Sequence, residues 1–266
     1  MDDGLAWQIS VWDQMAEIYQ QEIDRRFGPV IENLLSRANL ISGETVLDLG
    51  TGTGSVVIAA ANAIGPEGRI IGVDISSVML AKAQARIQAL ALSNVEFWEG
   101  QAEAIPAENG SLDVVLASLS LMYVIDRASA AGEIARVLRP GGRFVAAVWG
   151  GPEETDIVRF QQTAGRFAPT PPVNGVGPGA LADPNPFLSQ LAASGLEARC
   201  EKETTCFEFA NFQDAWDALA GVTTASLDPD IQEQAATAVR EIMWLDARLP
   251  REFQNATQFI TAVKPV

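Results

Sequence analysis

The chain has 266 residues, and its 34 acidic against 18 basic residues give a formal net charge of −16. A strongly acidic chain without a local basic patch does not favour binding to phosphate backbones. We therefore expect no nucleic-acid partner. Histidine is absent and cysteine occurs only twice, which removes the usual ligands of a zinc site, and we expect no metal.

The chain also lacks the signals of a membrane or secreted protein. No apolar run is long enough to span a bilayer, and the first residues lack the basic-then-apolar pattern of a signal peptide. We therefore expect a cytoplasmic protein with no membrane partner.

The N-terminal residues 7–40 are predicted to be helical, with a break at Gly28. Apolar and aromatic residues between Trp12 and Phe27 fall near one face, a pattern more typical of core packing than of a ligand site. Tyr19 is the exception that we keep as a site candidate, because a phenol has a polar end that needs a partner.

A buried-strand pattern that contains Asp48 runs into a glycine turn, and a helix follows from Ser55. Strand, glycine turn and helix form the nucleotide site of open α/β sheets. A dinucleotide site has the spacing G-x-G-x-x-G/A, whereas this turn reads G-x-G-x-G with Ser55 at the position of the third small residue. Asp48 would repel a pyrophosphate, so a cationic ligand with an amino group and a sulfonium fits better.

The next strand, residues 69–74, ends at Asp74, about 20 residues after the turn, where an acid can accept hydrogen bonds from both ribose hydroxyls. A helix cap is the alternative role for Asp74, but Ser76 or Ser77 already supplies one. Two further strands, 95–98 and 112–118, end in loops at the same edge of the sheet.

A helix after residue 130 stops at the Pro-Gly-Gly of residues 140–142 and turns into a strand at 143–149. This alternation predicts a parallel, doubly wound sheet. Beyond Gly150 the expected elements are a helix at 153–168, a Pro- and Gly-rich surface loop or lid at 169–186, a short helix at 186–194, a strand at 196–209, helices near 211–220 and 229–246, and a last strand at 255–263. Cys200 and Cys206 lie too far apart along one strand to form a disulfide.

Five segments in this order and spacing resemble the class I S-adenosylmethionine-dependent methyltransferases, and within them the small-molecule enzymes like those of ubiquinone and menaquinone biosynthesis. These segments are residues 46–54, 74–76, 100–103, 113–118 and 136–143. The resemblance covers roughly residues 40–150, and the C-terminal part matches only in layout.

The resemblance implies an α/β fold, a Rossmann-like doubly wound sheet of about seven strands, mostly parallel with an antiparallel last strand. It divides the chain into an N-terminal helical cap over the active site (1–40), a cofactor-binding core (41–150) and a helical substrate cap or lid with the last two strands of the sheet (151–266).

The resemblance also implies S-adenosylmethionine as cofactor and S-adenosylhomocysteine as product. Asp48 would lie near the amino group of the cofactor and Asp74 would hold its ribose hydroxyls. The other implied cofactor-binding residues are Gly50, Thr51, Gly52 and Gly54 beneath the methionine portion, Ile75, Met79, Gln101 and Ala102 at the adenine, and Ser118 and Leu119 beside the sulfonium. Many relatives have Asp where Gln101 stands, a replacement that changes the local charge.

Catalysis must proceed without histidine, which many relatives carry near Tyr123. Methyl transfer is an in-line displacement, so alignment supplies much of the acceleration and a strong base is not always required. An amine needs only to arrive neutral, whereas a phenol or alcohol must lose a proton. The candidate catalytic residues are Tyr19 and Tyr123, with Glu99 and Asp126 as further candidates for a base.

The acceptor is expected to be a small apolar or aromatic molecule, because aromatic residues are available for the substrate wall. The expected wall consists of Trp12, Tyr19, Tyr123, Trp149 and the region 150–250 with Phe160, Phe167, Phe187 and Trp216. Trp149 ends a strand and fits plain core packing at least as well.

Two other functions stay open beside a methyltransferase: a non-catalytic module that binds S-adenosylmethionine, and an NAD(P)-dependent oxidoreductase, against which the glycine spacing and Asp48 argue. The sequence leaves the acceptor, the methylated atom and the oligomeric state open, with a homodimer as one arrangement.

Overall fold

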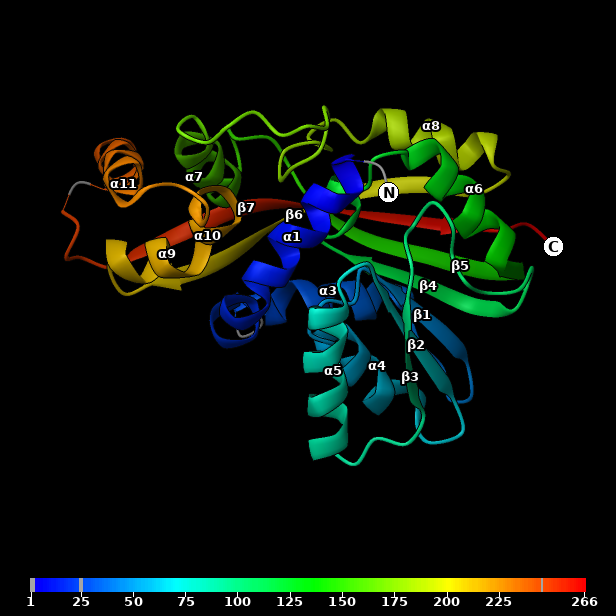
Figure 1. Cartoon of the computed structure of the whole chain (residues 1–266). Helices are drawn as coiled ribbons and strands as arrows, with labels where there is room; N and C mark the ends of the chain where they lie inside the picture. The colour runs from blue at the N-terminus through cyan, green and yellow to red at the C-terminus, as the bar shows by residue number, and fades with distance from the viewer. Residues whose placement is uncertain (1–2, 24–25, 245) are drawn as a thin grey trace.

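The computed structural model describes residues 3–23, 26–244 and 246–266, and within them seven strands form one sheet in the order β3-β2-β1-β4-β5-β7-β6 (Figure 1). The strands are β1 (Thr45–Leu49), β2 (Arg69–Asp74), β3 (Val95–Glu99), β4 (Leu112–Ser118), β5 (Leu138–Trp149), β6 (Glu197–Phe209) and β7 (Arg251–Val263). β1 to β5 run parallel and β7 is antiparallel to both its neighbours. The predicted fold, with its antiparallel last strand, is confirmed.

Helices cover both faces of this sheet. In sequence order they are α1 (Asp3–Ile18), the π-helical turn η1 (Tyr19–Ile23), α3 (Gly28–Ala38), α4 (Ser55–Ile64), α5 (Ser77–Ala89), the 3-10 turn η2 (Leu121–Tyr123), α6 (Arg127–Val137), α7 (Asp156–Gly165), α8 (Asn185–Ala193), α9 (Phe212–Leu219), α10 (Gly221–Thr224) and α11 (Pro229–Met243). α3 packs against α4, and α6 packs against α8 on the other side of the sheet (Figure 1). α1 crosses in front of the strand ends and packs against α5 and α10.

The strand order reverses between β1 and β4, which are direct neighbours with Asp48 opposite Leu116. The loops that follow these two strands therefore leave the sheet in opposite directions, and a crevice opens between them at the carboxyl edge. Ser120 closes the base of this crevice, because its hydroxyl donates to the Leu49 carbonyl at 2.7 Å. The sheet topology thus places a ligand site above Leu49.

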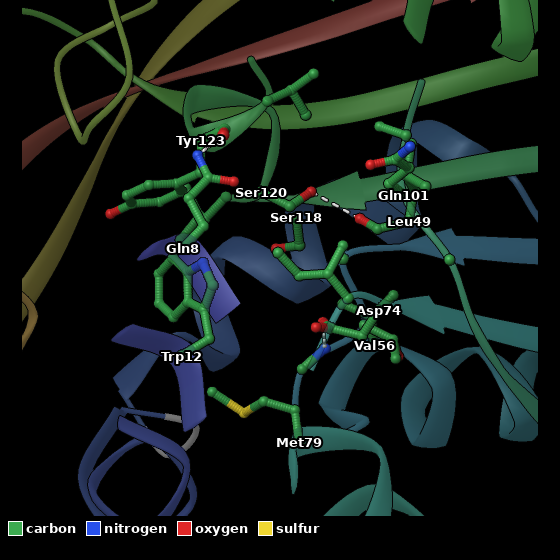
Figure 2. A pocket seen from close by; sticks show the side chains of 18 of the residues that line it. Gln8, Trp12, Leu49, Val56, Asp74, Met79, Gln101, Ser118, Ser120 and Tyr123 are labelled. Carbon is green, nitrogen blue, oxygen red and sulfur yellow. Dashed lines mark hydrogen bonds between the residues drawn. The ribbon is translucent and has the colours of Figure 1, made fainter. Parts of the chain in front are cut away.

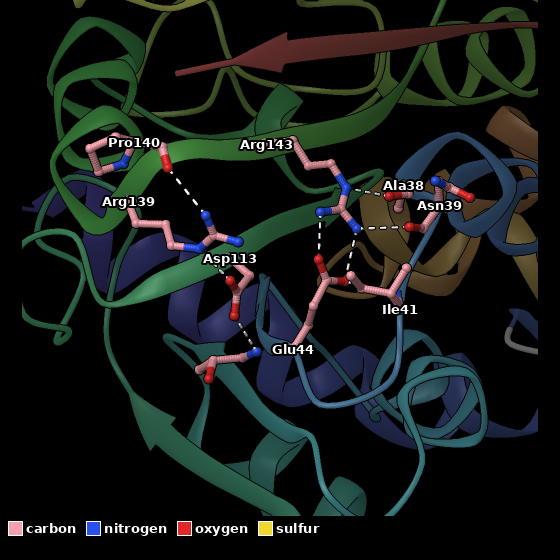
Figure 3. Close-up of polar contacts among 9 residues, drawn as sticks. Ala38, Asn39, Ile41, Glu44, Asp113, Arg139, Pro140 and Arg143 are labelled. Atoms are coloured by element: carbon pink, nitrogen blue, oxygen red, sulfur yellow. Dashed lines mark hydrogen bonds and ion pairs between the residues drawn. The ribbon is translucent and has the colours of Figure 1, made fainter. Parts of the chain in front are cut away.

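At the other end of the strands, where β5 begins, charged side chains of β5 join the sheet to its neighbours (Figure 3). The Arg143 guanidinium forms an ion pair with Glu44 at 2.7 Å and donates to the carbonyls of Ala38 and Asn39, which end α3. Glu44 is only 5% exposed, so Arg143 both neutralises a buried carboxylate and satisfies the helix C-terminus. The end of α3 is thereby fixed against the sheet.

β6 and β7 are longer than the strands of the core, and residues 251–256 of β7 extend past the end of β5. This overhanging ribbon has an aromatic core of its own, in which Phe209 lies 4.8 Å and Phe160 lies 6.2 Å from the Phe253 ring. Trp216 packs on Phe160 in the same cluster. Phe187 instead packs on Phe144 in the main core. These aromatic residues are therefore structural.

The boundaries differ from the sequence prediction mainly where the chain leaves the core. β5 begins at Leu138, which was expected in the preceding helix but pairs with Leu112. β7 begins at Arg251, since the overhanging ribbon extends it. Both cysteines are free, as expected. Within residues 3–23, 26–244 and 246–266, no helix is long and apolar enough to cross a membrane.

Candidate active site

A pocket of about 1100 Å³, counting the space at its open mouth, lies at the carboxyl ends of β1 to β4. Side chains of α1 close one side (Figure 2). The described lining residues are Leu5, Gln8, Trp12, Tyr19, Phe27, Ile31, Leu49, Gly50, Thr51, Gly52, Ser55, Val56, Asp74, Ile75, Met79, Gly100, Gln101, Ala102, Glu103, Ser118, Leu119, Ser120, Tyr123, Val124 and Ile125.

The glycine turn forms the floor of the pocket, and the amides of four of its residues already have partners. Gly50 and Thr51 both donate to the Val73 carbonyl, at 2.8 and 2.9 Å, and Gly54 donates to the Thr51 carbonyl. Gly52 donates to the Asp74 carboxylate at 2.8 Å. A pyrophosphate site needs such amides to be free, so this turn does not match a dinucleotide site.

Two positions of this turn require glycine for different structural reasons. Gly50 has φ +73°, and a Cβ there would lie 2.4 Å from the Cβ of Ser120. Gly54 has φ +86°, and a Cβ there would meet Ala83 at 3.1 Å. Gly54 was expected to contact the cofactor but lies outside the described lining, where it lets Ala83 of α5 approach the turn.

Asp74, at the end of β2, is 8% exposed and points into the pocket (Figure 2). One carboxylate oxygen accepts the Gly52 amide and the other accepts the Ser76 amide at 2.9 Å. Burial raises the pKa of Asp74, although these amides oppose the rise. Each oxygen keeps a free lone pair, which leaves room for two hydroxyl donors.

Asp48 lies beneath the turn and outside the pocket lining. It is 1% exposed, and neither of its carboxylate oxygens has a hydrogen-bond partner among the described residues. Burial raises the pKa of Asp48 to about 7. The Thr51 hydroxyl, which lines the pocket, is also buried without a partner within the described part of the chain. Such orphaned polar atoms are rare in folded proteins and fit a missing polar ligand.

The residues that the sequence places at the adenine lie together on one side of the pocket. Ile75, Met79, Gln101 and Ala102 all line it, and Met79 is 2% exposed. Ser76 caps α5 by accepting the Met79 amide at 3.0 Å, as one of the two predicted caps. The apolar side chains and one amide suit a heteroaromatic ring.

Ser118 and Leu119 line the pocket at the end of β4, between the two halves of the site. Leu119 has φ +55°, a left-handed conformation that is uncommon for a residue other than glycine. Its amide donates to the Ala147 carbonyl at 2.8 Å. Such strained residues cluster at functional sites, where the surrounding structure holds them in place.

Aromatic rings form the wall opposite the adenine end. The Trp12 ring stands edge-on to Tyr123, with centroids 4.7 Å apart, and to Tyr19 at 6.2 Å. Phe27 continues this wall at 6.3 Å from Tyr19. Burial among apolar neighbours raises the pKa of Tyr123, so its phenol stays neutral near pH 7.

The expected contribution of residues 150–250 to this wall is wrong for the part that the structure describes. The described lining runs only from Leu5 to Ile125. Phe160, Phe187 and Trp216 belong to the main core and the core of the overhanging ribbon, and Phe167 is half-buried outside the lining. Trp149 is 3% exposed and backs Phe27 from the core.

Of the other base candidates, Glu99 is exposed and lies outside the described lining. Asp126 caps α6 by accepting the Ser129 amide at 3.0 Å, and it also lies outside that lining. Neither acid is placed to take a proton from a bound acceptor.

Gln8 and Glu103 are among the polar pocket residues that the sequence interpretation did not assign to the site. Gln8 is 5% exposed and donates to the Tyr123 carbonyl, and its signal was a polar residue one helical turn from Trp12. Glu103 accepts the amides of Ile125 and Asp126, at 3.1 and 3.0 Å, and joins the loop after β3 to the segment after β4. The described residues contain no group of three or more acidic or cysteine side chains that could hold a metal ion.

Residues 40–162 match the family model described as a methyltransferase domain. This chain carries a class I S-adenosylmethionine-dependent methyltransferase domain. The cofactor of this family is S-adenosylmethionine, and the buried acids and orphaned polar atoms of the pocket fit it.

Two curated methyltransferases are similar to the chain in sequence. The demethylmenaquinone methyltransferase of Lactococcus lactis is 40% identical over 111 residues, which cover 42% of this chain and 44% of the relative. The nocamycin O-methyltransferase of Saccharothrix syringae is 33% identical over 183 residues, covering 68% of this chain and 63% of the relative. The chain thus spans less than two thirds of the length of these relatives.

Among solved structures, the YcgJ protein of Bacillus subtilis superimposes with a TM-score of 0.67 at 22% identity, covering 89% of this chain and 98% of that one. This likeness extends the shared fold to the C-terminal part, which the family model does not reach.

Proposed function

We propose that the protein transfers a methyl group from S-adenosylmethionine to a small apolar or aromatic acceptor and releases S-adenosylhomocysteine. The observation that carries this proposal is one continuous pocket with a buried acid at one end and aromatic rings at the other. The acid suits a ribose and the rings suit an apolar molecule. Ser118 and Leu119 lie between the two ends, where the transferred methyl group would pass.

The cofactor would lie with its ribose hydroxyls donating to Asp74 and its adenine against Ile75 and Met79. Its methionine portion would rest on Gly50 and Gly52. Asp48 lies behind the lining, so it would act on the cofactor's amino group through the Thr51 hydroxyl or a water. Gly54 would support the turn from behind.

The chemistry follows from alignment of the acceptor with the sulfonium in an enclosed site. Tyr123 would orient the acceptor as a neutral phenol, since its raised pKa leaves almost no phenolate near pH 7 to accept a proton. Tyr19 would form part of the same wall. The acceptor atom, whether oxygen, nitrogen or carbon, would then reach the site as a nucleophile that needs little help from a protein base.

Titration calorimetry with S-adenosylhomocysteine tests the cofactor site, and NAD⁺ and NADP⁺ serve as controls that should not bind. A panel of phenols, amines and apolar carboxylic acids is then screened for release of S-adenosylhomocysteine from S-adenosylmethionine. Turnover of an apolar or aromatic acceptor is the expected result. Cofactor binding without turnover on any acceptor would favour a non-catalytic binding module, and binding of NAD(P) would favour an oxidoreductase.

Three further expectations stay predictions: the cytoplasmic location, the homodimer, and the division into an N-terminal cap, a cofactor core and a C-terminal cap. The N-terminal cap has the most support, because Gln8 and Trp12 of α1 line the pocket.

A further inference from the structure

Helix α1 touches both ends of the pocket. Gln8 and Trp12 stand on the acceptor side, where Gln8 donates to the Tyr123 carbonyl. The next residue after Trp12, Asp13, reaches the cofactor side, and its carboxylate accepts a hydrogen bond from the Ser76 hydroxyl at 2.6 Å. A single helix therefore connects the acceptor wall with the loop that follows β2.

Ser76 is fully buried, and its polar groups are directed by three neighbours. Its amide donates to Asp74 at 2.9 Å, and its hydroxyl oxygen accepts the Met79 amide at 3.0 Å. The hydroxyl has one proton, which it gives to Asp13. The position of Asp13 therefore depends on how the loop of residues 74–76 is held.

This loop is the predicted ribose subsite. Asp74 is buried, and its carboxylate receives the amides of Gly52 and Ser76 while keeping lone pairs free toward the pocket. Two ribose hydroxyls donating to these lone pairs would fix the carboxylate, and with it the Ser76 backbone. The Ser76 hydroxyl would then be held in the position from which it donates to Asp13, and α1 would stay closed over the pocket.

We propose that Asp13 is a positioning residue that couples closure of α1 over the acceptor compartment to occupancy of the ribose subsite. The inference rests on the proposed function, since it takes the ligand of Asp74 to be the cofactor's ribose. Coupling of this kind is reciprocal, so a closed α1 also retains the cofactor. The acceptor wall is thus completed after the cofactor has bound.

A second contact between the same two helices provides a matched control. Glu17 of α1 forms an ion pair with Lys82 of α5, but the Glu17 side chain is 63% exposed and the pair does not touch the 74–76 loop. An exposed ion pair contributes little to stability. Asp13→Ala and Glu17→Ala therefore each remove one carboxylate from α1, and only the first loses the link to the ribose subsite.

Hydrogen–deuterium exchange of residues 5–16 in the full chain, with and without saturating S-adenosylhomocysteine, measures closure of α1. In the wild type we expect the ligand to slow exchange about tenfold, which is the effect expected when one hydrogen bond to a charged group is stabilised. Asp13→Ala should reduce this slowing to below about threefold and weaken ligand binding by no more than about tenfold, since the linkage is reciprocal. Glu17→Ala should behave like the wild type.

Asp13→Asn keeps an oxygen that can accept the Ser76 hydroxyl, and it should retain most of the protection. Equal protection in Asp13→Ala and the wild type would overturn the coupling, as would an equal loss in Glu17→Ala. The exchange of β1 and β4 checks that each variant is folded. Asp13→Leu, which also lacks an acceptor for the Ser76 hydroxyl but fills the space of the side chain, carries the test if Asp13→Ala does not fold. A wild-type chain that binds no S-adenosylhomocysteine would overturn the proposed function itself, so the two failures are distinct.

Discussion

The two halves of the pocket are built in different ways. The cofactor half consists of backbone at the ends of neighbouring parallel strands, held by main-chain hydrogen bonds such as that from Gly50 to the Val73 carbonyl. The acceptor half consists of side chains from α1 and from the segment after β4, in contact through the rings of Trp12 and Tyr123. The first half is fixed by the sheet, whereas the second depends on the docking of one helix. Cofactor recognition is therefore the rigid part, and acceptor recognition is the part that a few substitutions can change.

Loss of the ribose acid should have the largest effect. Asp74→Ala removes the acceptor of two proposed ribose hydrogen bonds, and at about 1.5 kcal/mol each we expect an approximately hundredfold loss of S-adenosylhomocysteine affinity by calorimetry. Asp126→Ala, which removes an exposed cap outside the described lining, is the control. An unchanged affinity in Asp74→Ala would show that the ribose lies elsewhere.

Truncation of the acceptor wall should leave the cofactor half intact. Trp12→Ala removes a ring that touches Tyr123 and Tyr19, and we expect kcat/KM for the acceptor found in the screen to fall about thirtyfold, as for loss of a buried aromatic anchor. Cofactor affinity should change less than about threefold by comparison, because Trp12 stands across the pocket from Gln101 (Figure 2). Trp7→Ala, on the same helix but outside the described lining, is the matched control. Equal losses of acceptor and cofactor binding would contradict the division into two halves.

Asp48 should link cofactor affinity to pH. Because burial raises its pKa to about 7, the carboxylate ionises only above that pH, and the affinity for the amino group of S-adenosylhomocysteine should rise between pH 6 and 8. Asp48→Asn should bind about tenfold more weakly than the wild type at pH 8 and show a flatter pH profile. A wild-type affinity that does not vary over this range would contradict the assignment.

The same substitution should stabilise the unliganded protein. An acid whose pKa is raised by folding keeps its proton in the native state while the unfolded chain loses it, so stability falls as the pH rises from about 4 to about 7. The asparagine of the Asp48→Asn variant carries no charge, so the free energy of unfolding at pH 8 should exceed that of the wild type by about 4 kcal/mol in urea denaturation. The difference should vanish near pH 4.

The smallest effect is expected for Tyr123→Phe. Burial keeps this phenol neutral, so removal of its hydroxyl should lower kcat less than about threefold and leave the pH–rate profile unchanged. A loss above a hundredfold, together with loss of the rise in rate as the pH increases, would instead make Tyr123 the base.

The cofactor half was predictable because its signals are local. A strand, a glycine turn and a following helix are adjacent in sequence, and the positions of Asp48 and Asp74 follow from where their strands end. Gly54 shows the limit of such patterns, because the same glycine that suits a ligand also lets Ala83 approach the turn. Only the packing of α5 separates the two roles.

The acceptor half could be predicted only in part. Trp12 and Tyr19 were recognised as a stripe on one helical face, but no local pattern singles out Asp13, because its partner Ser76 lies 63 residues away. The same limit explains why Phe160 and Trp216 were assigned to the substrate wall. Their place depends on the overhang of β6 and β7, which no local pattern encodes.

The order of strands in the sheet has a consequence for biosynthesis. β7 lies between β5 and β6, so a nascent chain that has emerged as far as Phe209 has made β6 but has no strand for it to pair with. The aromatic residues of β6 and the open edge of β5 then stay exposed until Arg251–Val263 leaves the ribosome. We therefore expect the half-made protein to need protection by chaperones late in translation, when the last strand is still missing from the middle of the sheet.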